Sequence, residues 1–357
     1  MKKIISFMLA IVMMVSMSAI SASASTVDAT ETAEIVNALN SVECVKDQLG
    51  LASVDFEHLS YSTNHIYAYD YTNDGLVYNS EFIPIVYDNS LIGWVIKATN
   101  ETNTVYQFST AFVDQVNSIV SSNMNIAFIY DYNASYLYDG KQLHKLNDIS
   151  LLVESRSILN TVDGLNITDV TLNGLSGYID LEYSSLNTNA RTPIYYSCNV
   201  SFVTQNPPSN MCWAASAACI ANYLNGTSHT ATSVAQDWYN TTTYADYNLG
   251  LTLGLQDDVL SDYGVSYTYK NQVPSDGVIF NNIYNGYPIQ ATFKWSNGYH
   301  DVVIYGINIT GGYIYVMDPE YGFCGTTYSA SSGHTYVSGY SGVTLTLNRA
   351  TCKYWTS

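Results

Sequence analysis

A cysteine at the start of a predicted helix is the residue of this 357-residue sequence best placed to do chemistry. Cys212 follows the loop Gln205-Asn206-Pro207-Pro208-Ser209-Asn210-Met211 and opens the alanine-rich run 212–224, whose apolar pattern predicts a helix. The first turn of a helix has unpaired N–H groups and the positive end of the helix dipole, so a thiol placed there favours its nucleophilic thiolate. An ordinary buried cysteine is the alternative interpretation, because free cysteine is often buried.

Gln205 lies seven residues before Cys212 and has a side chain suited to assist acyl transfer. Its amide can donate a hydrogen bond to the oxyanion of a tetrahedral intermediate, together with the backbone N–H of Cys212. Loss of one such donor typically lowers the rate by about 10²–10³. The alternative is a solvent-exposed loop glutamine without a catalytic role.

A histidine and an aspartate lie at the ends of two predicted strands joined by Thr310-Gly311-Gly312. His300 begins the apolar run 300–307, and Asp318 ends the run 313–318. A hairpin of this length brings the two side chains together, so that Asp318 orients His300 as a general base. Asp301 is the rival orienting residue, but as the strand neighbour of His300 it should point to the opposite face. A structural histidine and an Asp-Pro turn are the alternatives without catalysis.

In this combination, residues 200–320 resemble the papain-like cysteine peptidases, particularly the bacterial group with a peptidase-C39-like domain. The shared pattern is a glutamine, the helix start Cys212-Trp213-Ala214-Ala215, the strand start Gly298-Tyr299-His300 and the pair Asp318-Pro319. The resemblance implies an α+β fold in which a helix carrying the cysteine is followed by an antiparallel sheet. It also implies that Cys212 is the nucleophile, His300 the base, Asp318 the orienting residue and Gln205 the oxyanion donor, without a cofactor or a metal. Papain itself is expected to have asparagine in the third role and a slightly shorter spacing from glutamine to cysteine.

The N-terminus has the pattern of a secretory signal peptide. Met1-Lys2-Lys3 is followed by the apolar run 4–20 and by Ser21-Ala22-Ser23-Ala24-Ser25, which predicts a leader over residues 1–24 that is cut after Ala24. An uncleaved membrane anchor is the alternative. No later segment is apolar for long enough to span a bilayer. We therefore expect a secreted, extracellular protein, either free or associated with the cell wall.

Composition narrows the choice of partners. The formal net charge is −18, and most of the acidic excess lies in residues 25–191, which argues against nucleic acid and anionic membranes as partners. The six cysteines include no CxxC pair, which argues against a zinc site. Cys198, Cys324 and Cys352 allow disulfides whose pairing the sequence leaves open. Cys219 follows Cys212 by seven residues and is expected to be a core residue.

The first half, residues 25–190, is expected to be an α+β unit. Its pattern predicts a helix over 31–50, a hairpin of 82–87 with 91–98, a helix over 112–120 and a strand pair of 126–132 with 135–138. The unit is either a pro-region or a lasting targeting or binding domain. The polar segment 184–193 contains Arg191 and is either a processing site or a plain interdomain loop.

The second half, residues 191–357, is expected to form the papain-like domain. Its pattern predicts an extended run over 194–203, the helix that opens at Cys212, a helix near 233–238, and strands from Val278 to the end. Helices that come first and strands that come later are the order expected of an α+β fold.

The sequence supports three hypotheses about function. The first is a secreted bacterial cysteine peptidase, made as a precursor (a zymogen), monomeric, and hydrolysing protein or peptide substrates through a Cys212 thioester. The second is an acyl transferase or cell-wall peptide amidase that uses the same site. The third is a non-catalytic surface-binding protein in which the papain-like domain is only a scaffold.

Overall fold

The computed structural model describes most of the chain. The described residues are 29–43, 45–72, 75–99, 104–119, 124–131, 134–146, 168–170, 178–180, 194–206, 209–295, 298–320, 322–325, 327–329, 333–337 and 344–356. The predicted leader 1–24, the predicted processing segment 184–193 and the two prolines before Cys212 lie outside them. Within these ranges, no helix has the length and apolar character needed to cross a membrane.

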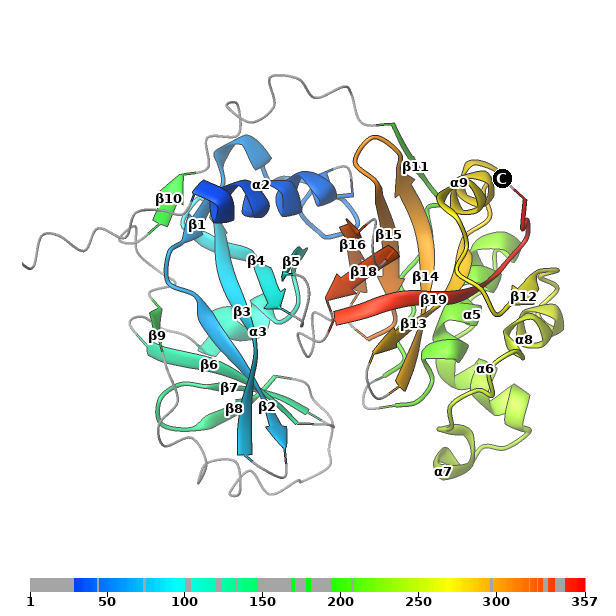
Figure 1. The fold of residues 1–357 in the computed structure, drawn as a ribbon. Coiled ribbons are helices and arrows are strands. Elements are labelled where there is room, and N and C mark those ends of the chain that lie inside the picture. Colours follow the sequence, from blue (N-terminus) through cyan, green and yellow to red (C-terminus); the bar gives the residue numbers. More distant parts are fainter. Residues whose placement is uncertain are drawn as a thin grey trace, which may run out of the picture.

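The first half builds a mixed sheet with helices against it (Figure 1). Its elements in chain order are α2 (Ala29–Glu43), the 3₁₀ helix η1 (Phe56–His58), β1 (Ser60–Ser62), β2 (Ile66–Thr72), β3 (Gly75–Tyr87), β4 (Ser90–Thr99), β5 (Thr104–Ser109), α3 (Val113–Ile119), β6 (Met124–Asp131), β7 (Ala134–Tyr138), β8 (Leu143–Lys145), β9 (Thr168–Val170) and β10 (Tyr178–Asp180). All of its pairings are antiparallel except that of β2 with β6. Strand β5 pairs with β4 alone, at an edge of the sheet.

Local sequence explains the best-predicted elements of this half. Strands β3 and β4 form the predicted hairpin, and its turn residues Asp88 and Asn89 have φ values of 49° and 62°. Positive φ at two successive residues is the conformation that tight hairpin turns require. The predicted helix over 112–120 and the pair β6–β7 are likewise confirmed. The helix predicted over 31–50 is shorter, because α2 ends at Glu43 and turns occupy 45–50.

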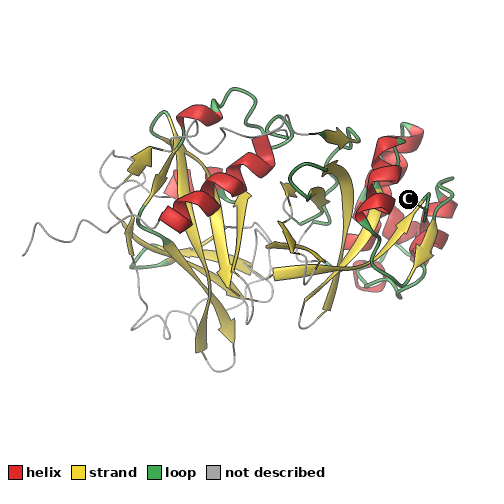
Figure 2. Cartoon of the chain, turned by 45° about the horizontal axis from the view of Figure 1, so that its top comes forward, coloured by secondary structure: helices red, strands yellow, loops and turns green. Residues whose placement is uncertain are grey.

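The second half builds a sheet with strand order β16-β15-β14-β13-β19-β18-β17. Its elements are β11 (Tyr195–Ser197), α5 (Cys212–Asn225), α6 (Ala231–Tyr239), α7 (Tyr244–Tyr247), α8 (Gln256–Asp262), β12 (Thr268–Lys270), α9 (Asp276–Tyr284), β13 (Ile289–Trp295), β14 (Gly298–Asn308), β15 (Tyr313–Asp318), β16 (Gly322–Gly325), β17 (Thr327–Ser329), β18 (Gly333–Val337) and β19 (Thr344–Cys352). Each strand pairing in this sheet is antiparallel. The helices of this half gather on the side away from the first half (Figure 2). A mixed α+β architecture is therefore confirmed.

One sequence prediction for the second half was wrong in detail. Val278 does not begin a strand, since it lies in helix α9, and the strands of the sheet start at Ile289. Ser275 caps this helix by accepting from the Val278 N–H, and Val278, Ile279 and Ile283 are buried on its inner face. The extended run over 194–203 forms a strand only at Tyr195–Ser197.

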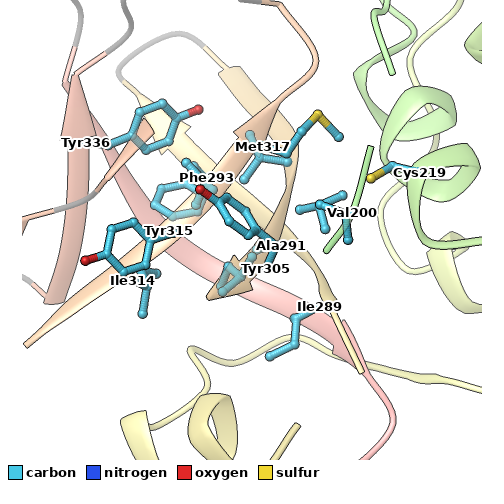
Figure 3. Close-up of a cluster of buried hydrophobic side chains, with 14 of the residues drawn as sticks. Val200, Cys219, Ile289, Ala291, Phe293, Tyr305, Ile314, Tyr315, Met317 and Tyr336 are labelled. Atoms are coloured by element: carbon cyan, nitrogen blue, oxygen red, sulfur yellow. The ribbon is translucent and has the colours of Figure 1, made fainter. Parts of the chain in front are cut away.

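The sheet of the second half is curled around apolar side chains. Aromatic and aliphatic residues from β13, β14, β15 and β18 fill its interior (Figure 3), where the rings of Phe293 and Tyr336 meet edge to face with centroids 4.9 Å apart. Neighbouring strands are about 4.8 Å apart, so four strand steps from β15 to β18 would span roughly 19 Å in a flat sheet. A direct hydrogen bond nevertheless joins Tyr336 of β18 to Asp318 of β15, so the sheet is curved.

The two halves meet where β5 and α2 of the first half contact both ends of the second sheet's strand order. Strand β5 and helix α2 contact the region of β16, β17 and β18 (Figure 1). Buried side chains of α2, such as Val36 and Leu39, belong to the same apolar cluster as the core of the second half. The edge strand β5 is therefore covered by the second half, which protects it from pairing with other chains.

Candidate active site

Cys212 is the first residue of α5, a helix that is anchored firmly at its N-terminal end. The preceding residue, Met211, provides no side-chain cap, so the helix start offers N–H groups to another acceptor. The loop beside it is fixed by Asn210, whose backbone N–H donates to Asn248 at 2.8 Å. The Trp213 indole donates to the Leu249 carbonyl at 2.9 Å. Cys212 itself is partly exposed, whereas the neighbouring helix residues are buried. Its thiol is therefore accessible and held in a defined position.

His300 and Asp318 are brought together by the hairpin of β14 and β15. The His300 Nε2 atom lies 2.8 Å from Asp318 Oδ1, and both side chains are buried. The Cys212 thiol of α5 lies close enough to the imidazole to help raise the pKa of His300. Because Nε2 is engaged by Asp318, Nδ1 is the nitrogen left for the thiol. The three residues thus form a continuous chain from sulfur through imidazole to carboxylate.

The electrostatics of this chain favour a charged imidazole. Burial alone would lower the pKa of His300, but the Asp318 carboxylate, with a further contribution from Cys212, holds that pKa well above its ordinary value. Burial would likewise raise the pKa of Asp318, but His300, the Tyr336 hydroxyl and the Glu320 N–H together lower it. The site therefore stabilises an imidazolium beside a carboxylate, which is the state that stabilises a neighbouring thiolate.

Two residues that sequence reasoning missed complete the surroundings of Asp318. The Tyr336 hydroxyl donates to Asp318 Oδ2 at 2.6 Å, and the Glu320 backbone N–H donates to Oδ1 at 2.8 Å. Both carboxylate oxygens are therefore held, and the one that faces His300 has a fixed direction. The Glu320 carboxyl also lies close to His300 and Asp318, with ligand atoms of all three residues within 4.8 Å of one another. No local pattern marks Tyr336, since it reaches Asp318 only through the curvature of the sheet.

Asp301 points away from His300, as its place on the strand predicts, and builds a separate buried network. Its carboxylate accepts hydrogen bonds from Thr292, Gln290 and Gln256, and its backbone carbonyl accepts from Ser216 of α5. Burial raises the pKa of Asp301, although the hydrogen bonds from these three side chains oppose the rise. Asp301 therefore joins β13, α8 and α5 on the far side of the strand from the His300 side chain and does not orient His300.

Gln205 is buried and lies on the side of the site where Asp318 ends its strand. Its backbone N–H donates to the Pro319 carbonyl at 2.9 Å, which ties the glutamine loop to the turn after Asp318. Its side-chain Nε2 donates to the Ser209 carbonyl at 3.0 Å. The Oε1 atom has no partner among the described residues. The amide thus keeps one N–H for another acceptor, and the structure brings Gln205 to the site without a direct contact to Cys212 or His300.

The other described cysteines are buried and have no disulfide. Cys198, Cys219 and Cys352 are free, and Cys219 donates to the Ser201 carbonyl in the core. Burial raises the pKa of Cys198 to about 11 and that of Cys352 to about 12. Of the described cysteines, Cys212 is the one that combines exposure with a histidine partner. Cys44 and the side chain of Cys324 lie outside the described set. Because Cys198 and Cys352 are free, the disulfides expected among Cys198, Cys324 and Cys352 are not formed by these two residues.

Among the described residues, two groups of side chains have donor sets that suit a metal ion. One is His300 with Asp318 and Glu320, and the other is Glu31 with His65 and Glu81 in the first half. In the second group, the Lys97 ammonium lies 2.7 Å from Glu31 and 3.6 Å from Glu81, and so already supplies the positive charge. In the first group, the His300–Asp318 bond uses the ligand atoms. Both groups are therefore explained by hydrogen bonds and ion pairs.

A polar groove lies apart from these residues. Its volume is about 640 Å³, and it is lined by Asn199, residues 201–204, Asn206, Asn222, Tyr223 and residues 227–230. None of Cys212, His300 or Asp318 lines it. Cys212 with the hydrogen-bonded pair of His300 and Asp318, rather than this groove, is therefore the arrangement with catalytic potential.

Comparison with known families agrees with this geometry. Residues 194–331 match the family model described as papain-like cysteine protease AvrRpt2 (Peptidase_C70), a range that includes Cys212, His300 and Asp318. No curated protein matches the chain. The match supports the papain-like cysteine peptidases as the family of this region, and the protein is therefore a cysteine-type peptidase. The match does not extend to the peptidase-C39-like group that the sequence suggested.

Proposed function

We propose that the protein hydrolyses peptide bonds through a thioester on Cys212, with His300 as the proton carrier and Asp318 as the residue that orients it. The observation that carries the proposal is the hydrogen-bonded pair of His300 and Asp318 beside Cys212, which lies at an uncapped helix start. A nucleophile, a base in contact with it and a third group that orients the base are the parts that covalent catalysis requires.

In the acylation half, the Cys212 thiolate attacks the carbonyl carbon of the scissile bond and its electron pair forms a C–S bond. The negative charge passes to the carbonyl oxygen. The His300 imidazolium then gives its Nδ1 proton to the leaving nitrogen, the C–N bond breaks, and the thioester remains. Asp318 keeps Nε2 occupied, so that the ring cannot turn away from the sulfur.

In the deacylation half, neutral His300 takes a proton from water, the resulting hydroxide attacks the thioester, and the C–S bond breaks. The acid product leaves, and Cys212 and His300 return to the thiolate and imidazolium pair. In both halves the oxyanion needs donors, and we assign this role to the Cys212 backbone N–H and to the remaining N–H of the Gln205 amide.

The proposal includes export and processing of a precursor. The lysines and apolar run of residues 1–24 support a cleaved signal peptide, and the polar segment 184–193 with Arg191 supports a cut between the two halves. Residues 25–190 then act as a pro-region, and residues 191–357 form the peptidase domain. We propose that the mature protein is a secreted monomer that acts on proteins or peptides.

Comparison of three purified proteins tests the catalytic role of Cys212: wild type, Cys212→Ala and Cys219→Ala. We expect Cys212→Ala to lose peptide hydrolysis by at least about 10³-fold, because the nucleophile is absent. The variant should also stay full length if the cut near residues 184–193 is made by the protein itself. Rates on a fluorogenic peptide mixture, intact mass and N-terminal sequencing provide the measurements.

Cys219→Ala is the matched control, since it removes a buried thiol from the same helix without touching His300. Activity that survives in Cys212→Ala would rule out this nucleophile. A wild type that a thiol-directed probe labels at Cys212, but that only transfers acyl groups to amines, would favour the acyltransferase hypothesis over hydrolysis.

A further inference from the structure

Glu320 places a second carboxyl group beside the proposed proton carrier. It is the second residue after Asp318, and its backbone N–H donates to Asp318 Oδ1 at 2.8 Å. Its carboxylate oxygen lies within 4.8 Å of the ligand atoms of His300 and Asp318. His300 and Asp318 are buried, whereas Glu320 is partly exposed. Glu320 is therefore the carboxyl group of this trio that a substrate can reach.

The charges of this cluster do not balance. With His300 protonated and both Asp318 and Glu320 ionised, one negative charge is left without a positive partner. No lysine or arginine of the described chain forms an ion pair with Asp318 or Glu320. Uncompensated charge in a partly buried site is unfavourable, and a cation brought by a ligand would relieve it.

The protonation of Glu320 reflects this imbalance. Burial raises the pKa of Glu320 to about 7, and the Asp318 charge adds to that rise while His300 opposes it. The groups that face Glu320 are His300 from β14 and Asp318 from β15. Cys212 lies beyond His300, and Tyr336 lies beyond Asp318. Glu320 therefore gains its charge in the neutral pH range, where a cationic partner would stabilise the ionised form.

The position of Glu320 also indicates which part of a substrate it meets. His300 gives its proton to the leaving nitrogen, so the residue that supplies this nitrogen lies next to the imidazole during catalysis. The bond from the Gln205 N–H to the Pro319 carbonyl ties the Glu320 turn to the loop that carries the proposed oxyanion donor. A side chain on the leaving residue is thus within reach of the Glu320 carboxylate.

We propose that Glu320 is a specificity-determining residue that binds a cationic side chain, so that the enzyme prefers peptide bonds followed by lysine or arginine. This inference rests on the proposed peptidase function of Cys212 and His300, and it adds the class of substrate. A charge-assisted hydrogen bond between carboxylate and ammonium or guanidinium supplies the selectivity.

Peptides that differ only in the residue after the scissile bond, namely lysine, arginine or glutamine, test the proposal. For wild type we expect kcat/KM for the lysine and arginine peptides to exceed that for the glutamine peptide on the order of tenfold at pH 8. The preference should be smaller at pH 6, where Glu320 is protonated. In Glu320→Gln, the ratio should fall to about one at both pH values.

The ratio is the decisive quantity, because Glu320→Gln can also lower kcat for every peptide through His300 and Asp318. Asp258→Asn is the control, since it removes an exposed carboxylate of α8 outside the site and should leave the ratio unchanged. Wild type that cleaves all three peptides equally, or a Glu320→Gln ratio equal to that of wild type, overturns the assignment of Glu320 but leaves the peptidase function intact. Failure to cleave any peptide, together with no labelling of Cys212 by a thiol-directed probe, overturns both.

Discussion

At the scale of single residues, the charge of Asp318 determines over which pH range His300 stays protonated. Asp318 holds the pKa of His300 well above its ordinary value, so the thiolate and imidazolium pair persists to alkaline pH and is lost when His300 releases its proton. In Asp318→Asn the hydrogen bond acceptor remains but the charge does not. We expect kcat/KM to fall about 10- to 100-fold, and the alkaline limb of its pH profile to move to lower pH.

A second His–Asp pair in the same domain provides the control for this prediction. His334 Nε2 lies 2.7 Å from Asp276, and neither residue touches Cys212. Asp276→Asn should leave the alkaline limb of the profile where it is. If Asp318→Asn and wild type have the same alkaline limb, the carboxylate does not control the protonation of His300.

The sequence predicted the meeting of His300 and Asp318 because a short hairpin, Thr310-Gly311-Gly312, carries both residues. It also predicted that Asp301 faces the other way, since neighbours on a strand alternate. Tyr336 could not be predicted, because its contact with Asp318 depends on how far the sheet curls. The role proposed for Glu320 depends on distances in three dimensions for the same reason.

At the scale of elements, the curvature of the second sheet lets β18 support the residue that ends β15. Tyr336, which belongs to the buried cluster of Figure 3, donates to Asp318 Oδ2 at 2.6 Å. Tyr336→Phe keeps the ring packing and removes one donor to a buried carboxylate. We expect kcat/KM to fall about 10- to 100-fold. The acid limb of its pH profile should move to higher pH, because Asp318 then takes up a proton more readily.

Tyr267→Phe separates this positioning effect from a general loss of stability. Tyr267 is also buried and donates to the Pro288 carbonyl at 2.8 Å, away from the site. Both variants lose one buried hydrogen bond and should unfold at similarly reduced temperatures, but only Tyr336→Phe should shift the acid limb. Equal pH profiles for the two variants would limit Tyr336 to a structural role.

Elements with a strong local signal were the ones that the sequence predicted well. The hairpin of β3 and β4 has the turn residues Asp88 and Asn89, and α5 has its alanine-rich run. Helix α9 was mistaken for the start of a strand region because the apolar group around Val278 is short, and short apolar runs do not distinguish helix from strand. Ser275, the N-cap of this helix, was the residue in the sequence that could have indicated a helix start.

At the scale of the whole molecule, the apolar cluster shared by the two halves predicts that they stay associated after a cut between them. Val36 and Leu39 of α2 and Phe108 of β5 are buried in the cluster that also contains the core of the second half. Burial of apolar surface stabilises by roughly 25 cal/mol per Å², so several buried side chains give a contact that persists without a covalent link. The cut alone therefore should not release residues 25–190.

A Cys212→Ala protein in which residues 186–190 are replaced by the recognition sequence of an unrelated protease tests this expectation. After complete cleavage, we expect both fragments to elute together in size-exclusion chromatography and to separate only in denaturant. Leu39→Glu should weaken the contact, because it buries a charge in the shared cluster, and its cleaved fragments should elute apart. If the cleaved fragments of the protein that retains Leu39 also elute apart, the shared cluster is too weak to hold the halves together. Co-elution would mean that a precursor cut at this segment needs a second event, such as degradation of the first half, before its pro-region leaves.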